Sequence, residues 1–128
     1  MEHRLAVKVY YEDTDCLGVV YHANYLKYME RGRSEYVGML GKSIRDLNRE
    51  GYNIAVYAMN IKFRRAATLG DELEVVSRFR LASPYRGIFD QRVERGGELI
   101  AEAEVELVCL DDQRRLRRFP PELQPSEP

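Results

Sequence analysis

Between residues 98 and 109, apolar and acidic side chains alternate almost perfectly along the chain. The apolar series is Leu99, Ala101, Ala103, Val105, Leu107 and Cys109, and the interleaved acids are Glu98, Glu102, Glu104 and Glu106. This period of two is typical of a β-strand that has one face on a core and the other in solvent. The segment therefore requires a sheet and a second layer that covers its apolar face.

Four further segments alternate in the same way, at residues 4–11, 55–63, 73–81 and 89–93. Short turns such as "SPYRG" at residues 83–87 separate the later ones, which is typical of antiparallel hairpins. From Asn24 the period becomes helical for about four turns, as far as Gly38 or Gly41. A short second helix is predicted from an N-cap at Ser43 to Gly51.

These elements predict an α+β fold in which a five-stranded antiparallel sheet wraps around one long central helix. The length of 128 residues fits a single domain over residues 1–128, with a tail that frays from about residue 119. The chain carries 20 basic and 21 acidic side chains, for a net charge of -1. A balance of this kind predicts no nucleic-acid partner.

The sequence contains no run of about 18 apolar residues, so it predicts no membrane-inserted segment. The first ten residues do not resemble a signal peptide. The two cysteines, Cys16 and Cys109, are isolated and match no disulfide or zinc pattern. We therefore expect a soluble, cytoplasmic protein without a metal or redox cofactor.

The stretch "YYEDTDCLGVVYHANY", residues 10–25, gathers three carboxylates, a cysteine and a histidine directly before the long helix. A calcium loop would explain Asp13, Asp15 and Gly18. It fails at two later ligand positions, because Leu17 and Asn24 cannot supply the missing carboxylates.

A thiol nucleophile is a second interpretation, with Cys16 activated by His22. In a third, a carboxylate of the loop faces a carbonyl whose oxygen accepts hydrogen bonds from free N–H groups of the first helical turn. Gly18 would let the loop bend tightly towards a ligand. The plain alternative is that the acids only cap the helix and solvate the loop.

The segment "EDTDCLGVVYHANYLKYMERGRSE" closely resembles the signature of the 4-hydroxybenzoyl-CoA thioesterase family of the hotdog-fold superfamily. It is most similar to the Tol-Pal-associated branch of bacterial acyl-CoA thioesterases. The resemblance rests on Thr14-Asp15, on Gly18 with the two valines that follow, and on His22 and Tyr25. The element order extends it from Leu5 to about Leu110.

The resemblance implies that Asp15 is the catalytic carboxylate, acting either as nucleophile or as general base for water. It implies that the backbone N–H of His22 polarises the thioester carbonyl. The His22 side chain is either a second polar group near the reacting atoms or a buried, hydrogen-bonded histidine. Glu30 and Glu35, on the helix, are expected to be surface or supporting acids.

The family also implies a basic surface for the CoA phosphates, and here the turn "PYRGIF" keeps only Arg86. Arg64 and Arg65 either share this work or form a solvated strand end. The resemblance implies a homodimer or homotetramer whose active sites lie between subunits. The acyl pocket is expected to be lined by side chains such as Tyr25, Tyr28, Tyr57 and Met59. The alternative function is an acyl-CoA-binding or regulatory hotdog protein with little turnover.

Overall fold

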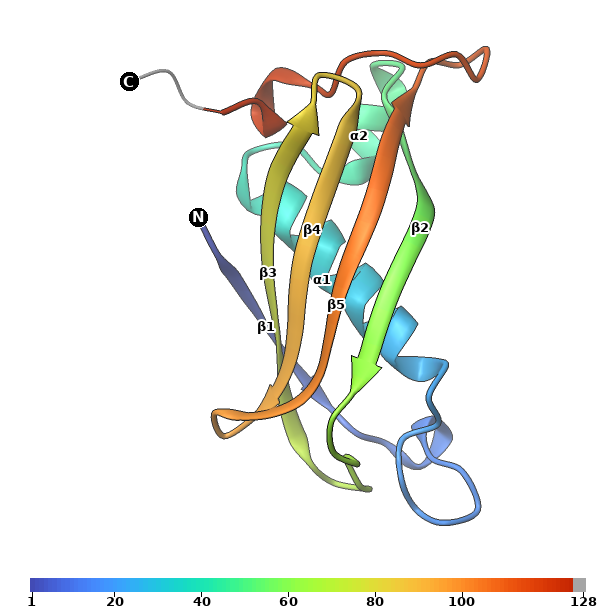
Figure 1. The fold of residues 1–128 in the computed structure, drawn as a ribbon, viewed down its shortest axis with the longest axis vertical. Coiled ribbons are helices and arrows are strands. Elements are labelled where there is room, and N and C mark those ends of the chain that lie inside the picture. Colours follow the sequence, from blue (N-terminus) through green and yellow to red (C-terminus); the bar gives the residue numbers. More distant parts are fainter. Residues whose placement is uncertain (126–128) are drawn as a thin grey trace.

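The structure is a computed structural model that describes residues 1–125. Its elements in chain order are β1 (His3–Lys8), the 3-10 helix η1 (Tyr11–Asp13), α1 (Asn24–Met39), α2 (Ile44–Arg49), β2 (Asn53–Phe63), β3 (Glu72–Ser83), β4 (Arg86–Arg95), β5 (Glu98–Leu110) and the 3-10 helix η2 (Pro121–Leu123). The five strands form one antiparallel sheet in the order β1-β3-β4-β5-β2. The sheet curves around α1, which lies across its inner face (Figure 1). This arrangement confirms the predicted α+β hotdog fold.

From Ala101 onward, strand β5 has the alternation predicted from its sequence. The prediction that Leu99 belongs to the same inward series is wrong, because the register against β4 shifts between Ala101 and Leu99 and Ile100 is buried instead. Five apolar side chains of β5 are buried on the face towards α1, namely Ala101, Ala103, Val105, Leu107 and Cys109. Its neighbour β4 buries Phe89 and Val93 on the same face, in register with Val105 and Ala101 of β5. The central strands therefore supply one continuous apolar layer for the helix.

The helix α1 meets this layer along a seam that includes Tyr28, Met29 and Gly32. A Cβ atom at Gly32 would lie only 2.7 Å from Cγ1 of Val75, so glycine allows the helix to approach β3 closely. The buried Gln91 amide donates to the carbonyl oxygen of Met29 at 2.8 Å. It also donates to the Ser77 hydroxyl at 2.9 Å, so its burial is compensated by hydrogen bonds.

The short helix α2 begins as its sequence predicts. The Asp46 N–H donates to the Ser43 hydroxyl at 3.1 Å, and the Ser43 N–H donates to the Asp46 carboxylate at 3.2 Å. This reciprocal pair is a capping box. Among residues 1–125 no helix is both long and apolar enough to span a lipid bilayer.

Strand β2 differs from the simple alternation predicted for it. Its register against β5 shifts between Val56 and Ala58, which leaves Tyr57 in a bulge. The Tyr57 side chain is half exposed, whereas Val56 and Met59 both oppose buried residues of β5. The prediction that Tyr57 belongs to the same inward series as Met59 is wrong, because the bulge inserts one residue and moves the pattern out of phase.

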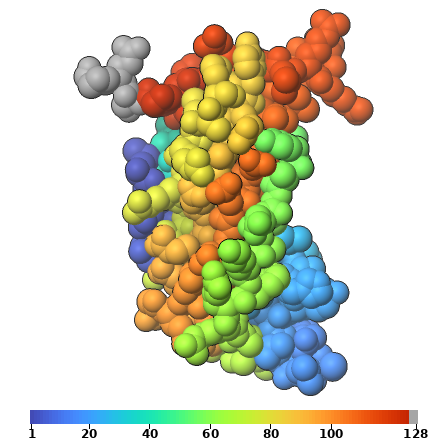
Figure 2. All heavy atoms as spheres, viewed as in Figure 1, coloured from blue at the N-terminus to red at the C-terminus, as the bar shows by residue number. Residues whose placement is uncertain are grey.

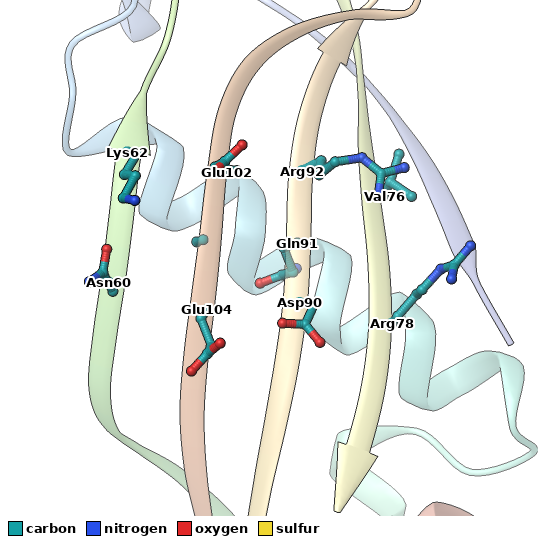
Figure 3. Close-up of a pocket in the computed structure, with 10 residues that line it drawn as sticks. Asn60, Lys62, Val76, Arg78, Asp90, Gln91, Arg92, Glu102 and Glu104 are labelled. Carbon is teal, nitrogen blue, oxygen red and sulfur yellow. The ribbon is translucent and has the colours of Figure 1, made fainter.

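The outer face of the sheet, away from α1, carries many charged side chains, among them Arg78, Asp90 and Glu104 (Figure 3). Arg80 of β3 bonds Asp90 of β4 at 2.9 Å, and Arg86 of β4 bonds Glu106 of β5 at 3.1 Å. The face holds a shallow hollow of about 440 Å³ (Figure 3), lined by Asn60, Lys62, Val76, Arg78, Asp90, Gln91, Arg92, Glu102, Ala103 and Glu104. None of the predicted site residues lines it, so the candidate chemistry lies elsewhere.

The tail after β5 is packed rather than frayed. It first pairs back on the end of β5, through the Arg117 N–H to the Cys109 carbonyl oxygen at 2.9 Å. Phe119 and Leu123 are then buried in the core. The expectation of fraying from about residue 119 is therefore wrong for residues 119–123, because these two apolar side chains anchor the segment. Residues 126–128 of that expected tail lie outside the described residues.

Candidate active site

The loop before α1 is closed by its own backbone hydrogen bonds. Strand β1 ends at Lys8, three residues earlier than predicted, because residues 11–13 form η1 instead. The Asp15 N–H then donates to the Val19 carbonyl oxygen at 2.9 Å, and the Gly18 N–H donates to the Asp15 carbonyl oxygen at 3.0 Å. Gly18 has a φ of +78°, which a residue with a Cβ rarely adopts. The predicted tight bend at Gly18 is confirmed.

The Asp15 carboxylate is half-buried within this loop. One of its oxygens, Oδ1, accepts a hydrogen bond from the Leu17 N–H at 2.8 Å, the geometry of an Asx turn. Among residues 1–125 no protein group donates to Oδ2. The carboxylate is thus oriented through one oxygen, and the other is available to a substrate or a water molecule.

The start of α1 leaves two backbone N–H groups unused. The N–H groups of Asn24, Tyr25 and Leu26 donate to the carbonyl oxygens three residues before them, at 2.8, 3.3 and 3.2 Å. The N–H groups of His22 and Ala23 have no acceptor within residues 1–125. The free donors at this helix end therefore lie just ahead of the first turn rather than within it.

The His22 side chain is exposed. Its ring lies 4.5 Å from the Tyr21 ring and 6.3 Å, edge-on, from the Phe63 ring at the end of β2. The interpretation of His22 as a buried, hydrogen-bonded histidine is wrong, because the helix end turns the imidazole outward. No hydrogen bond joins it to Cys16 in the described part of the chain, and the Cys16 thiol is exposed.

Tyr25 packs beneath the exposed rings of His22 and Phe63. It is buried, its ring lies 5.5 Å from that of Phe63, and its hydroxyl accepts a hydrogen bond from the Ala67 N–H at 3.4 Å. Burial raises the pKa of the Tyr25 hydroxyl above its ordinary value. In a single protomer Tyr25 supports the surface of the site and does not line it.

The expected acyl-pocket residues separate into two groups. Tyr28 is fully buried in the core, and its pKa is raised by burial and by the nearby Asp13 carboxylate. Met59 instead lines a groove of about 520 Å³ between α1 and β2, together with Leu26, Lys27, Glu30, Arg31, Arg33 and Val56. The groove begins at Leu26, about one helical turn after His22.

Arg64 and Arg65 follow β2 at the same end of the molecule as the Asp15 loop. Arg64 bonds Glu102 at 3.1 Å and Arg65 bonds Glu98 at 3.2 Å. Both guanidinium groups are largely exposed, so these are weak surface pairs that a phosphate could displace. The loop and the end of β2 form one continuous surface at this end (Figure 2).

The turn between β3 and β4 lies at the opposite end of the sheet (Figure 1), and Arg86 begins β4 directly after it. It is level with Val108 of β5, whereas Phe63 is level with Ala101. Seven strand positions at roughly 3.3 Å each separate the two rows by about 23 Å. One protomer therefore does not bring Arg86 to Asp15.

The tail adds basic residues to the Arg86 end. Arg118 lies 5.9 Å from the centre of the Tyr85 ring, and Arg117 lies 3.7 Å over the Tyr52 ring. They line a hollow of about 670 Å³ together with Leu116, Phe119, Pro121 and Gln124. The sequence shows this basic run. The position of this run next to Arg86 depends on the burial of Phe119, and no local sequence pattern reveals that burial.

The residues therefore form two separate groups. Asp15, Gly18, His22, Tyr25, Arg64 and Arg65 share one end, and Arg86 lies at the other. Among residues 1–125 no three His, Cys, Asp or Glu side chains gather as a metal site requires. A carboxylate with one free oxygen, in a loop that leads to unpaired N–H groups, can attack or activate water at a carbonyl that those N–H groups polarise.

The chain is similar to known thioesterases over most of its length. The Thioesterase-like superfamily matches residues 9–126. Acyl-CoA thioester hydrolase YbgC of Escherichia coli is 38% identical over 109 residues, which cover 84% of this chain and 81% of that protein. Acyl-CoA thioesterase YbgC of Haemophilus influenzae is 38% identical over 106 residues, which cover 82% and 78%.

Solved structures agree with this relationship. A probable thioesterase from Bartonella henselae has a TM-score of 0.88 at 32% identity, over 94% of this chain and all of that one. A 1,4-dihydroxy-2-naphthoyl-CoA thioesterase from Synechocystis has a TM-score of 0.88 at 23% identity, over 95% and 92%, and supports the fold alone. The match over residues 9–126 places the chain in the Thioesterase-like superfamily, and the chain is a thioesterase.

Proposed function

We propose that this protein hydrolyses acyl-CoA thioesters, with Asp15 as the catalytic carboxylate. The observation that carries the proposal is the Asp15 carboxylate, held through Oδ1 with Oδ2 free, in a loop that ends at the unpaired N–H groups of His22 and Ala23. The names of the Escherichia coli and Haemophilus influenzae relatives support acyl-CoA as the substrate.

In the proposed reaction the thioester carbonyl oxygen accepts a hydrogen bond from the His22 N–H. The carbonyl carbon is attacked either by Asp15 or by a water molecule that Asp15 deprotonates. The carbon–sulfur bond then breaks and CoA leaves as a thiol. In the first case one water molecule then cleaves the resulting mixed anhydride and supplies the proton of the CoA thiol. Both routes consume one water and yield a carboxylic acid and free CoA. The negative charge that develops on the carbonyl oxygen is stabilised by the N–H group and by the positive end of the α1 dipole.

A complete substrate site requires a second copy of the chain. The Asp15 end offers Arg64 and Arg65, while Arg86 lies about 23 Å away along the sheet and the tail arginines lie at the same far end. A partner subunit that brings its Arg86 turn to the Asp15 loop would complete a basic surface for the CoA phosphates. The unpaired edge of β2, with Phe63 half exposed, supports a homodimer, and a homotetramer would bring further turns together.

Gly18 and Tyr25 contribute by shape in this proposal. Gly18 lets the loop approach the thioester, and Tyr25 supports Phe63 beneath it. The groove beside Met59 would receive the acyl chain. Both cysteines are unpaired within residues 1–125, which supports a cytoplasmic location. The reaction as written uses no cofactor.

Thiol release tests the proposal directly. The purified chain is incubated with acyl-CoAs of graded length and with aromatic acyl-CoAs, and free CoA is measured with a thiol reagent. Saturable turnover of at least one acyl-CoA is the expected result. Tight binding of the same acyl-CoAs without thiol release would instead support the alternative function, a binding or regulatory hotdog protein.

A further inference from the structure

The segment 64–71, between β2 and β3, holds the Asp15 loop in place through backbone hydrogen bonds. The Val20 N–H donates to the Ala67 carbonyl oxygen at 2.8 Å, and the Leu69 N–H donates to the Gly18 carbonyl oxygen at 3.2 Å. Val19, whose carbonyl oxygen accepts from the Asp15 N–H, is bridged to Thr68 in the same short ladder. The position of Asp15 therefore depends on the position of residues 67–69.

One carboxylate oxygen fixes residues 67–69 in turn. Oδ2 of Asp71 accepts from the Thr68 N–H at 2.8 Å, from the Thr68 hydroxyl at 3.1 Å and from an Arg95 guanidinium nitrogen at 2.6 Å. The Thr68 N–H, followed by the Arg95 guanidinium, holds the pKa of Asp71 below its ordinary range. Asp71 is thus a charged acceptor shared by the segment and by strand β4.

Arg95 connects this segment to the most extensively paired part of the sheet. The nitrogen that bonds Asp71 also donates to the Ala66 carbonyl oxygen at 3.2 Å, and the other terminal nitrogen bonds Glu98 at 2.6 Å. Arg95 ends β4 and Glu98 begins β5. The planar guanidinium therefore spans from the β4–β5 hairpin to the segment 64–71.

We propose that Arg95 and Asp71 are positioning residues for the reaction, which act on Asp15 through Thr68 and the ladder to Gly18–Val20. The inference rests on the proposed catalytic role of Asp15. Neither side chain lies in the loop that carries the chemistry, so they affect turnover through the placement of the carboxylate relative to the His22 N–H. A displacement of the Asp15 carboxylate by about 1 Å relative to the His22 N–H is enough to lower the rate about 100-fold.

The variants separate charge from geometry. Arg95→Ala removes every contact of the guanidinium. Arg95→Lys keeps the charge, but one ammonium cannot contact Asp71, Ala66 and Glu98 together. Asp71→Asn keeps an acceptor oxygen for Thr68 and removes the charge. Arg80→Ala is the matched control, because it breaks an exposed arginine–aspartate pair of 2.9 Å on the outer face.

Steady-state kinetics and amide hydrogen exchange are measured on each variant of the full chain. For Arg95→Ala we expect kcat to fall by about 10- to 100-fold with KM within about threefold, and exchange at Val20 and Leu69 to become at least about tenfold faster. Exchange at Ala103 and Val105 in β5 should not change. Arg95→Lys should lie between Arg95→Ala and the wild type, and Arg80→Ala should match the wild type in both readouts.

The proposal is overturned if Arg95→Ala exchanges faster at Val20 and Leu69 yet keeps the wild-type kcat, or if Arg80→Ala loses as much activity. If Arg95→Ala does not fold, Arg95→Lys and Asp71→Asn decide by the same two readouts. If the wild type releases no thiol from any acyl-CoA, the proposed function fails. In that case the exchange rates alone still test whether Arg95 and Asp71 hold the Asp15 loop against residues 67–69.

Discussion

The imidazole ring of His22 lies edge-on to the Phe63 ring, with the two centroids 6.3 Å apart. This contact joins the N-terminal end of α1 to the last residue of β2. It places the Asp15 loop and the segment 64–71 on one surface, although they come from different parts of the chain. The candidate active site is therefore a product of the sheet's curvature around the helix as well as of the signature in residues 12–35.

The substitution Asp15→Asn should remove turnover and preserve binding. The amide still offers an oxygen to the Leu17 N–H, so the loop keeps its shape, but it neither attacks a carbonyl nor takes a proton at neutral pH. We expect kcat to fall by at least about 100-fold. Thiol release measures the loss, and calorimetric titration with a non-hydrolysable acyl-CoA thioether measures binding. The exposed neighbour Glu12→Gln is the control, and full activity of Asp15→Asn would contradict the assignment.

Isotope labelling can distinguish the two proposed roles of Asp15, nucleophile and general base. A single turnover in ¹⁸O-labelled water, followed by mass spectrometry of the peptide that contains Asp15, detects label in its carboxylate. A mixed anhydride that water opens at the aspartyl carbonyl leaves label there, whereas simple general-base catalysis leaves none. Label in the carboxylate would therefore exclude the general-base route for that turnover.

Cys16→Ala should remain active. The Cys16 thiol is exposed and has no hydrogen bond to His22 within the described residues, so it lacks the base that a nucleophilic thiolate requires. We expect kcat/KM within about twofold of the wild type, the range of an ordinary surface substitution. A loss as large as that of Asp15→Asn would restore the thiol interpretation.

The local sequence predicted the parts of the fold that depend on neighbouring residues. The period of β5 from Ala101 onward, the capping box of Ser43 and the bend at Gly18 are all properties of short segments, and the structure confirms them. The bulge at Tyr57 escaped prediction because alternation cannot reveal one inserted residue. The burial of Phe119 also escaped, because its contacts are with residues distant in sequence, such as Phe79.

The candidate site likewise has features that the sequence predicts and features that only the tertiary structure reveals. The signature predicts Asp15, Gly18 and His22 as one group because the loop and the helix end are contiguous in sequence. It could not show that Arg86 lies at the other end of the sheet, since that depends on strand length and register. The link from Arg95 through Asp71 to the loop joins three segments, and only the tertiary structure brings them together.

Gly18→Ala should lower both stability and turnover. The Cβ atom meets nothing within 4 Å, but the φ of +78° is unfavourable for alanine by about 1–2 kcal/mol. Relief of this strain would move the Asp15 carboxylate. Urea unfolding measures the stability loss and thiol release measures kcat. Gly41→Ala is the control, because Gly41 also has a positive φ of +119° and lies beyond the far end of α1. It should lose stability without losing kcat per folded molecule.

The ion pair of Asp71 should make part of the stability depend on pH. Its pKa is lower in the folded state than in the unfolded state, where it is about 3.9. Its charged interactions therefore stabilise the fold fully above the unfolded-state pKa, and this contribution is lost as the pH falls through the folded-state pKa. Asp71→Asn should be less stable than the wild type by about 1 kcal/mol at pH 7. Urea unfolding between pH 7 and pH 3 should show the difference narrowing below about pH 4. A stability difference between the two forms that stays constant down to pH 3 would contradict a stabilising role for the Asp71 charge.

Arg86→Ala should weaken the recognition of CoA while leaving the chemistry unchanged. In the wild type its guanidinium bonds Glu106 at 3.1 Å on the surface, and a phosphate of CoA would compete for it. Since such an exposed ion pair contributes up to about 1 kcal/mol, we expect KM for acyl-CoA to rise about two- to fivefold with kcat unchanged. The effect should shrink at high salt, because the charges are near solvent. A truncated thioester that lacks the nucleotide should be hydrolysed equally by both forms, and Arg80→Ala controls for the loss of a surface charge. If KM rises equally for the truncated thioester, Arg86 does not contact the nucleotide.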